Sequence, residues 1–92
     1  MNLLKLRQEI LNIDREIILL LKKRFYIIKK ISNEKKKLNL KIQNLNYENF
    51  LLEKYTNKIK NQYLKSFIKN IFTQIFSSSR DYQKVESSSE EK

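Results

Sequence analysis

Arginine is the residue type whose placement in this sequence most directly suggests chemistry. Only four arginines occur beside 16 lysines, and Arg7 and Arg24 interrupt or flank an otherwise apolar helical pattern. The planar guanidinium group can hold a carboxylate through two parallel hydrogen bonds, which the lysine ammonium group cannot reproduce. Both positions are therefore candidates for binding an anionic ligand, although a single arginine at the edge of an apolar helix face more often only carries its charge into solvent.

Lys35 adds a second cation on the helix face of Arg24. It lies 11 residues after Arg24, close to three helical turns, so the two side chains share a face roughly 16 Å apart and can approach a small ligand from its two ends. Arg7 lies 17 residues before Arg24, roughly 25 Å away, and cannot join the same site within one chain. In an antiparallel two-fold dimer it could enter the partner's site. Lys35 also stands in a run of three lysines, for which a solvated surface is the ordinary interpretation.

Three further polar residues lie where a helical scaffold does not require them. Ser79 and Gln83 are four residues apart, so they stack on one helix face and continue the apolar surface of Phe72 and Phe76 with polar groups. Glu48 falls in the first turn of a predicted helix, where the helix dipole also favours a carboxylate. Each residue has an ordinary structural explanation as well. Spacing alone therefore leaves the function undecided between an anion-binding enzyme and a helical scaffold.

Three predicted helices would position these residues. Apolar residues recur at helical spacing in each of them, and Asn2 and Asn44 are the candidate N-caps of the first two. The predicted elements are a helix at 3–34, a loop at 39–44, a helix at 45–60 and a helix from after Asn61 to about Lys84. In the loop, asparagine is expected to adopt the left-handed or turn conformations that glycine usually supplies. Residues 85–92, VESSSEEK, are predicted to form a disordered acidic tail, which leaves 1–84 as one helical domain.

The length of the first predicted helix favours a dimer. At about 48 Å it is roughly twice as long as a compact bundle of this size needs, and a chain of 92 residues buries little core alone. Its far half can be covered only by another chain. The predicted fold class is therefore all-α, with three helices, one of them a long N-terminal helix, in an intertwined two-fold homodimer.

Composition excludes several kinds of site. The chain contains no Gly, Pro, Cys or His, so it offers no thiol nucleophile, imidazole base, Cys/His zinc site or Gly-rich phosphate loop, and we expect no metal and no cofactor. The formal charge of +10 would ordinarily suggest nucleic acid or anionic lipid as a partner. Because the lysines are spread over every segment, we expect neither nucleic acid nor a membrane. No apolar stretch approaches the roughly 20 residues that span a bilayer, and the expected location is the cytoplasm.

With these residues placed, the sequence resembles the all-helical (type II) chorismate mutase family. The helix-one signature of that family, L-R-x-x-I-x-x-I-D-x-x-I-x-x-L-L-x-x-R, is present from Leu6 to Arg24. The match extends from about residue 3 to residue 83 without a gap, and the joint spacing is more specific than any single residue. At the family's spacing the signature is followed by Lys35, Glu48, Ser79 and Gln83.

The resemblance implies a chorismate mutase, an isomerase that converts chorismate to prephenate in the biosynthesis of phenylalanine and tyrosine. It implies that Arg24, together with the partner's Arg7, holds the two carboxylates of the substrate. Lys35 and Gln83 would donate hydrogen bonds to the ether oxygen, and Lys35 would also touch a carboxylate. The rearrangement is intramolecular and pericyclic, so it requires positioning and stabilisation of developing charge rather than a nucleophile or a base.

On the ring side, the resemblance implies that Glu48 accepts a hydrogen bond from the substrate hydroxyl and that Ser79 assists at a carboxylate. Two departures from the family pattern fall here. The family often has arginine immediately before this glutamate, where the sequence has Tyr47, and often has aspartate four residues before it, where the sequence has Asn44. Asn44 is still expected to contact the substrate through its backbone or its side chain.

Two other functions remain open from the sequence. The related isochorismate-pyruvate lyase shares the fold, the cationic pocket and a pericyclic path, and a glutamate facing a ring hydroxyl favours the mutase over it. From another class, the chain could be a non-catalytic basic helical dimer that binds nucleic acid or a partner helix. Against that function, the basic residues form no single stripe, and Ser79 and Gln83 place polar groups on a face that a scaffold would keep apolar.

Overall fold

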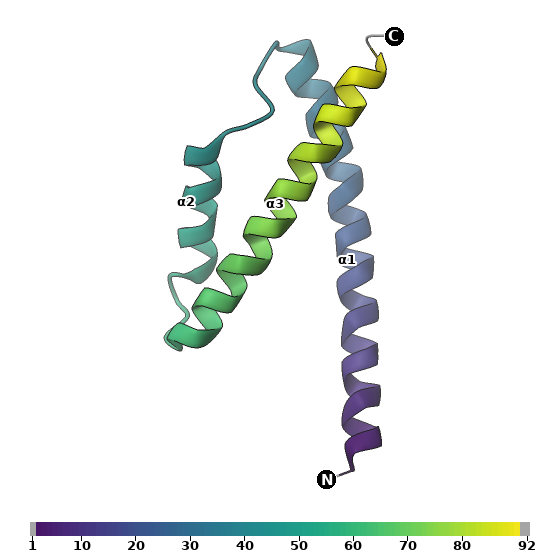
Figure 1. Ribbon diagram of the computed structural model, residues 1–92, viewed down its shortest axis with the longest axis vertical. Helices are drawn as coiled ribbons and strands as arrows, with labels where there is room; N and C mark the ends of the chain where they lie inside the picture. Colours follow the sequence, from purple (N-terminus) through teal and green to yellow (C-terminus); the bar gives the residue numbers. More distant parts are fainter. Residues whose placement is uncertain (1, 91–92) are drawn as a thin grey trace.

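The protein is built from three α-helices joined by two short connections (Figure 1). The computed structural model describes the backbone of residues 2–90. The helices are α1 (Leu3–Lys37), α2 (Leu45–Thr56) and α3 (Gln62–Glu90), and no strand occurs within the described residues. The predicted all-α class with three helices and one long N-terminal helix is confirmed.

The arrangement is open, with principal extents of 56 × 27 × 14 Å. α3 packs against both α1 and α2, and it meets α1 near the C-terminal ends of the two helices, while the N-terminal half of α1 projects away (Figure 1). α2 and α3 form an antiparallel pair. None of the three helices has the length and apolar character needed to cross a lipid bilayer, over the residues that the structure describes.

An asparagine side chain begins each helix. The first backbone N–H groups of a helix have no partner within it, and an asparagine oxygen at the N-cap accepts a hydrogen bond from one of them. The N-cap assignments of the first two helices are therefore confirmed. The N–H of Leu4 donates to the side-chain oxygen of Asn2 (2.9 Å) at the start of α1, and the N–H of Tyr47 donates to the side-chain oxygen of Asn44 (3.1 Å) at the start of α2. At the start of α3, the N–H of Leu64 donates to the side-chain oxygen of Asn61 (3.0 Å).

The C-terminus of α1 is closed by a left-handed residue. Asn39 has φ of 58°, as expected for an asparagine that takes the place of glycine. The N–H of Leu40 donates to the carbonyl of Lys35 (2.8 Å), and the N–H of Asn39 donates to that of Lys36 (3.2 Å). These two bonds form a Schellman motif, which satisfies carbonyls at the helix end. Because the motif needs these carbonyls, α1 ends at Lys37, three residues after the predicted end.

The ends of the other two helices also differ from the predicted ones. α2 ends at Thr56 rather than at about Lys60, since the N–H of Ile59 turns back to the carbonyl of Thr56 (3.1 Å) and tightens the last turn. α3 continues to Glu90 rather than ending at about Lys84, in a segment that lacks both of the usual helix-stopping residues, Gly and Pro. Of the predicted tail, residues 91–92 lie outside the described residues.

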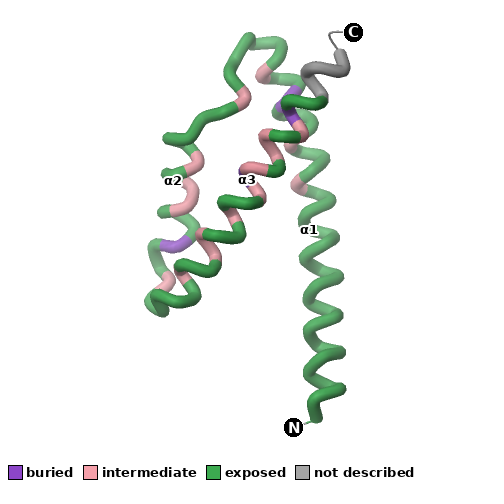
Figure 2. Tube along the Cα trace, viewed as in Figure 1, coloured by how far each residue is buried: buried purple, intermediate pink, exposed green. Residues whose placement is uncertain are grey.

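Very little apolar surface is buried within one chain. Phe76 is the buried apolar residue of the described part, and the other buried side chains are the polar Ser32, Thr56 and Gln83. Figure 2 shows the N-terminal half of α1 exposed along its whole length. A run of leucine and isoleucine in contact with water is typical of a surface that meets another protein chain.

The left-handed residue at the end of α1 gives the first testable prediction. Asn39→Ala should have a free energy of unfolding about 1 kcal/mol below that of Asn39→Gly, because the left-handed conformation crowds a Cβ atom. Urea denaturation at a fixed protein concentration measures the difference. Asn33, exposed inside α1, is the matched control, where glycine should be the less stable residue by about 1 kcal/mol. The same order of alanine and glycine at both positions would contradict this role of Asn39.

Candidate active site

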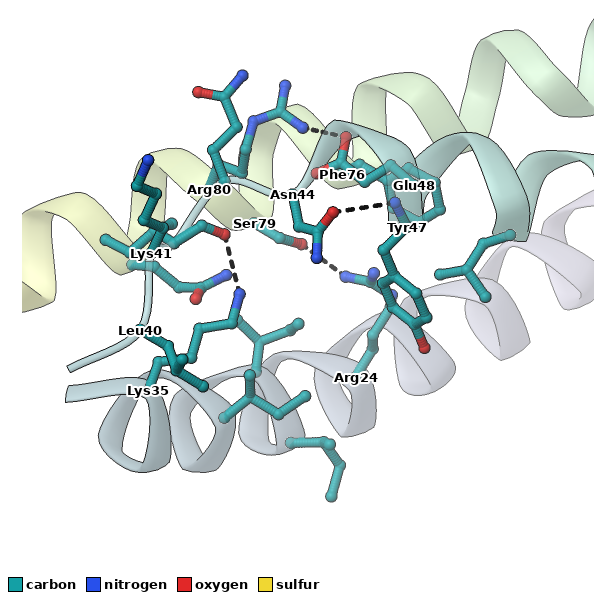
Figure 3. Close-up of a pocket in the computed structure, with 17 residues that line it drawn as sticks. Arg24, Lys35, Leu40, Lys41, Asn44, Tyr47, Glu48, Phe76, Ser79 and Arg80 are labelled. Atoms are coloured by element: carbon teal, nitrogen blue, oxygen red, sulfur yellow. Dashed lines mark hydrogen bonds and ion pairs between the residues drawn. The ribbon is translucent and has the colours of Figure 1, made fainter. Parts of the chain in front are cut away.

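The main pocket lies where the C-terminal half of α1 faces the connection 38–44, the start of α2 and the second half of α3 (Figure 3). Its volume is about 690 Å³, within the usual range for a site that binds a small molecule. Six of the seven predicted site residues line it, namely Arg24, Lys35, Asn44, Glu48, Ser79 and Gln83. The three helices thus bring residues that are up to 59 positions apart onto one cavity.

Arg24 is held in place by α3. Its Nη1 atom donates to the hydroxyl oxygen of Ser79 (2.6 Å), and that hydroxyl donates to the carbonyl of Ile75 (2.8 Å). The guanidinium carbon also lies 5.7 Å from the ring centre of Phe76, a distance at which a cation is attracted to an aromatic face. Desolvation by burial lowers the pKa of Arg24, partly offset by Tyr55, and a guanidinium remains charged at neutral pH. Arg24 is therefore a fixed cation at the edge of the pocket.

Lys35 lies further along α1 and binds the connection that covers the pocket. Its Nζ atom donates to the carbonyl of Ile42 (2.9 Å), and Figure 3 shows it separated from Arg24 along the stretch of α1 that borders the cavity. An ammonium group carries three donors. One bond to the connection leaves capacity for a ligand, so Lys35 can hold the segment 38–44 and face an anion at the same time.

Glu48 makes an ion pair that the sequence did not predict. Its carboxylate accepts a hydrogen bond from the Nη1 atom of Arg80 across the contact between α2 and α3 (Figure 3), and both side chains are only 18% exposed. Arg80 also lines the pocket. One feature of the sequence could have indicated Arg80 as a site residue, because it is one of only four arginines and directly follows Ser79. The ion pair itself could not be predicted in this way, because Glu48 lies on another helix.

Gln83 brings an unpaired polar atom to the pocket. The residue is 4% exposed, and its side-chain oxygen is buried without a hydrogen-bond partner among the described residues. A buried acceptor that lacks a donor costs about 1–3 kcal/mol. A buried polar atom without a partner calls for a specific explanation, and a functional role is one such explanation.

Asn44 and Arg7 differ in how they relate to the pocket. Asn44 lines it, but its side-chain oxygen is occupied by the N–H of Tyr47, which leaves the NH₂ group for other contacts. Arg7 does not line it, because it lies on the exposed N-terminal half of α1, roughly 25 Å from Arg24 along the helix axis. The single chain therefore assembles all the predicted site residues except Arg7.

The electrostatic character of the pocket is strongly cationic. Its lining contains four basic side chains, Arg24, Lys35, Lys41 and Arg80, and one carboxylate, Glu48, which gives a formal charge of +3. Cations gathered in a partly enclosed site attract an anion more strongly than the same charges dispersed in water. A lining of this charge can bind a small ligand that carries more than one negative charge.

The geometry defines the class of this protein: it is an all-helical domain with a cationic pocket where its helices cross. The family model for chorismate mutase type II matches residues 6–84. The chain belongs to this family, and the resemblance drawn from the sequence is confirmed.

Comparison with curated proteins gives a relative of the same kind. The bifunctional chorismate mutase/prephenate dehydratase of Buchnera aphidicola subsp. Schizaphis graminum (strain Sg) is 40% identical over 75 residues, which are 82% of this chain and 19% of that protein. The chain thus spans about a fifth of the length of this relative. No solved structure gives a significant match.

The unpaired amide oxygen gives a prediction about stability. Gln83→Leu should raise the free energy of unfolding by about 1 kcal/mol, because leucine fills a similar volume without leaving an acceptor unsatisfied. Thr56→Val is the contrasting variant, since the fully buried Thr56 hydroxyl donates to the carbonyl of Leu52 (2.7 Å); its loss should lower the free energy by up to about 1 kcal/mol. Urea denaturation measures both. A marked loss of stability in Gln83→Leu would show that the amide stabilises the fold.

Proposed function

We propose that the protein is a chorismate mutase that rearranges chorismate to prephenate. The observation that carries the proposal is the convergence of Arg24, Lys35, Glu48 and Gln83 from three helices on one cationic pocket, in a chain of this family. Chorismate carries two carboxylates, a ring hydroxyl and the ether oxygen whose bond to the ring breaks. The pocket offers a matching group for each of these features.

Arg24 and Lys35 would first bind the carboxylates of the substrate. The guanidinium of Arg24 faces the pocket with donors beyond the one given to Ser79, and these can form a two-pronged contact with one substrate carboxylate. Ser79 fixes the guanidinium before the substrate arrives, so little ordering is left to occur on binding. These contacts would hold the flexible side arm of the substrate over its ring, in a conformation that is rare in solution. For an intramolecular reaction, such positioning supplies a large part of the rate enhancement.

Lys35 and Gln83 would act on the bond that breaks. As the ether bond to the ring lengthens, negative charge grows on its oxygen, and donors already in position stabilise that charge more in the transition state than in the ground state. The Lys35 ammonium supplies a charged donor and the Gln83 amide a neutral one. No proton needs to be transferred, so the lack of His and Cys in the sequence does not limit this chemistry.

Glu48 would recognise the ring hydroxyl. Its Oε1 atom is bound by Arg80, and a carboxylate has a second oxygen and further lone pairs that can accept from a hydroxyl. Without such a role, a carboxylate in this pocket would only repel an anionic substrate. A specific acceptor role accounts for its presence, and it favours chorismate mutase over isochorismate-pyruvate lyase.

We further propose an intertwined homodimer in which each pocket receives the partner's Arg7. The exposed apolar residues of α1 include Ile10, Ile13 and Ile17. A two-fold axis crossing α1 halfway between Arg7 and Arg24 would place each Arg7 beside the other chain's Arg24. The same packing would cover the exposed stripe, which a monomer leaves in contact with water. The cytoplasmic location and the absence of nucleic acid, membrane and cofactor partners stay predictions from the sequence.

Incubation of the purified protein with chorismate tests the activity. We expect chorismate to be consumed and prephenate to appear, with no release of pyruvate from isochorismate. Arg24→Lys keeps the charge but loses the planar fork, so kcat/KM should fall at least tenfold, or about 1.4 kcal/mol, with little change in stability. Absence of turnover by the parent protein would overturn the proposed function. Unchanged kinetics in Arg24→Lys would instead show that Arg24 does not grip the substrate.

Subunit mixing tests the shared site. Arg7→Ala and Arg24→Ala chains should each be nearly inactive alone. A heterodimer of the two would have one pocket with both arginines and one with neither, so mixed subunits should recover up to about half of the parent activity per heterodimer. Mass spectrometry of intact dimers verifies the exchange, and an Arg7→Ala sample exchanged with itself is the control. No recovery after verified exchange would contradict the shared site.

A further inference from the structure

The ion pair between Arg80 and Glu48 is unlike the other ion pairs of the described residues. Both of its side chains are 18% exposed, whereas Lys69 and Glu53 are 32% and 66% exposed and Lys37 and Glu34 are 74% and 65% exposed. An exposed pair adds little to stability because water screens it. A pair withdrawn from water must be well oriented to offset its desolvation. This pair also borders the pocket, which the other two pairs do not.

The positions of the two residues explain why they meet. Arg80 follows Ser79 and lies three residues before Gln83, so it is on the side of α3 that faces the pocket. Glu48 is in the first turn of α2, whose start is fixed by the Asn44 cap. The ion pair therefore ties the capped end of α2 to the pocket side of α3. In Figure 3 the Arg80 guanidinium meets the Glu48 carboxylate at the opposite side of the cavity from Lys35.

The charges in the pocket make this pairing consequential. Glu48 is the one acid among the described lining residues, and Arg24, Lys35 and Lys41 are the cations it could otherwise join. A carboxylate bound to Arg24 or Lys35 would occupy the groups that an anionic substrate needs. The bond to Arg80 holds the carboxylate at the α2–α3 side instead. It uses one oxygen and leaves the other free for a hydroxyl.

We propose that Arg80 is a positioning residue for Glu48: it holds the carboxylate where it accepts the substrate hydroxyl and keeps it away from the cations that bind the substrate carboxylates. This inference rests on the proposed chorismate mutase function. Arg80 acts through Glu48 and not by contact with the reacting atoms. This positioning role also explains why Arg80, which the sequence did not place in the site, lines the pocket.

A double-mutant cycle with chorismate as substrate tests the inference. Arg80→Met keeps much of the unbranched stem of the side chain and removes the charged guanidinium group, so kcat/KM should fall about 10- to 100-fold as Glu48 loses its orientation. Arg80→Lys restores a cation and should recover part of the loss. In a Glu48→Gln background the carboxylate is already absent, so adding Arg80→Met should change kcat/KM less than about threefold.

The matched control is Lys69→Met, which removes the exposed ion pair between the same two helices through Glu53. It should leave kcat/KM within about twofold of the parent. Thermal unfolding of every variant identifies losses that come from instability. If Arg80→Met is too unstable to assay, the comparison of Arg80→Lys with the parent, alone and with Glu48→Gln, gives the same test.

The possible outcomes separate the two hypotheses. Turnover by the parent with normal kinetics in Arg80→Met would overturn the positioning role and leave the proposed function intact. Effects of Arg80→Met and Glu48→Gln that multiply in the double variant would also overturn it, because they would show that Arg80 contacts the substrate independently. An equal loss in Lys69→Met would show a general need for ion pairs between α2 and α3. Absence of turnover by the parent would overturn both hypotheses together.

Discussion

The hydrogen bond between Arg24 and Ser79 is the interaction on which the geometry of the pocket depends. It joins α1 to α3 at their crossing, beside Phe76, the buried apolar residue of the described part of the chain. Because the bond is charged and partly withdrawn from water, it is stronger than an ordinary surface contact. The residue that anchors the crossing is thus also the cation that faces the pocket. The same side chain therefore contributes to the contact between the helices and to the proposed binding of the ligand.

The poor core of a single chain follows from this arrangement. Among the described side chains, three polar residues and one apolar residue are buried, and the buried side-chain oxygen of Gln83 has no hydrogen-bond partner there. A chain organised in this way directs its polar groups to the pocket and its apolar groups to the outside of α1. Coverage of α1 by a second copy would supply the missing burial. It would also explain why, of the predicted site residues, one chain brings together all except Arg7 from the exposed half of α1.

The sequence predicted the starts of elements better than their ends. Asn2 and Asn44 were identifiable as caps because capping depends on a few neighbouring residues, and the spacing of Arg24 and Lys35 follows from helix geometry alone. The ends of the helices depend on contacts such as the Schellman motif at Asn39, and without Gly or Pro the sequence marks them less sharply than it marks the caps. Arg80 was missed for the same reason. Its role depends on α2 lying beside α3, which periodicity within one helix does not reveal.

The departures from the family pattern are consistent with the charges in the pocket. Asparagine in place of aspartate at Asn44 removes a negative charge, and tyrosine in place of arginine at Tyr47 removes a positive one, so together they leave the formal charge unchanged. Asn44 still caps α2, since asparagine and aspartate are equally good N-caps. Glu48 nevertheless requires a cationic neighbour to remain oriented among so many bases. Arg80 provides it from α3, across the contact between helices instead of along α2. The same local balance of charge can therefore be reached from a different element of the fold.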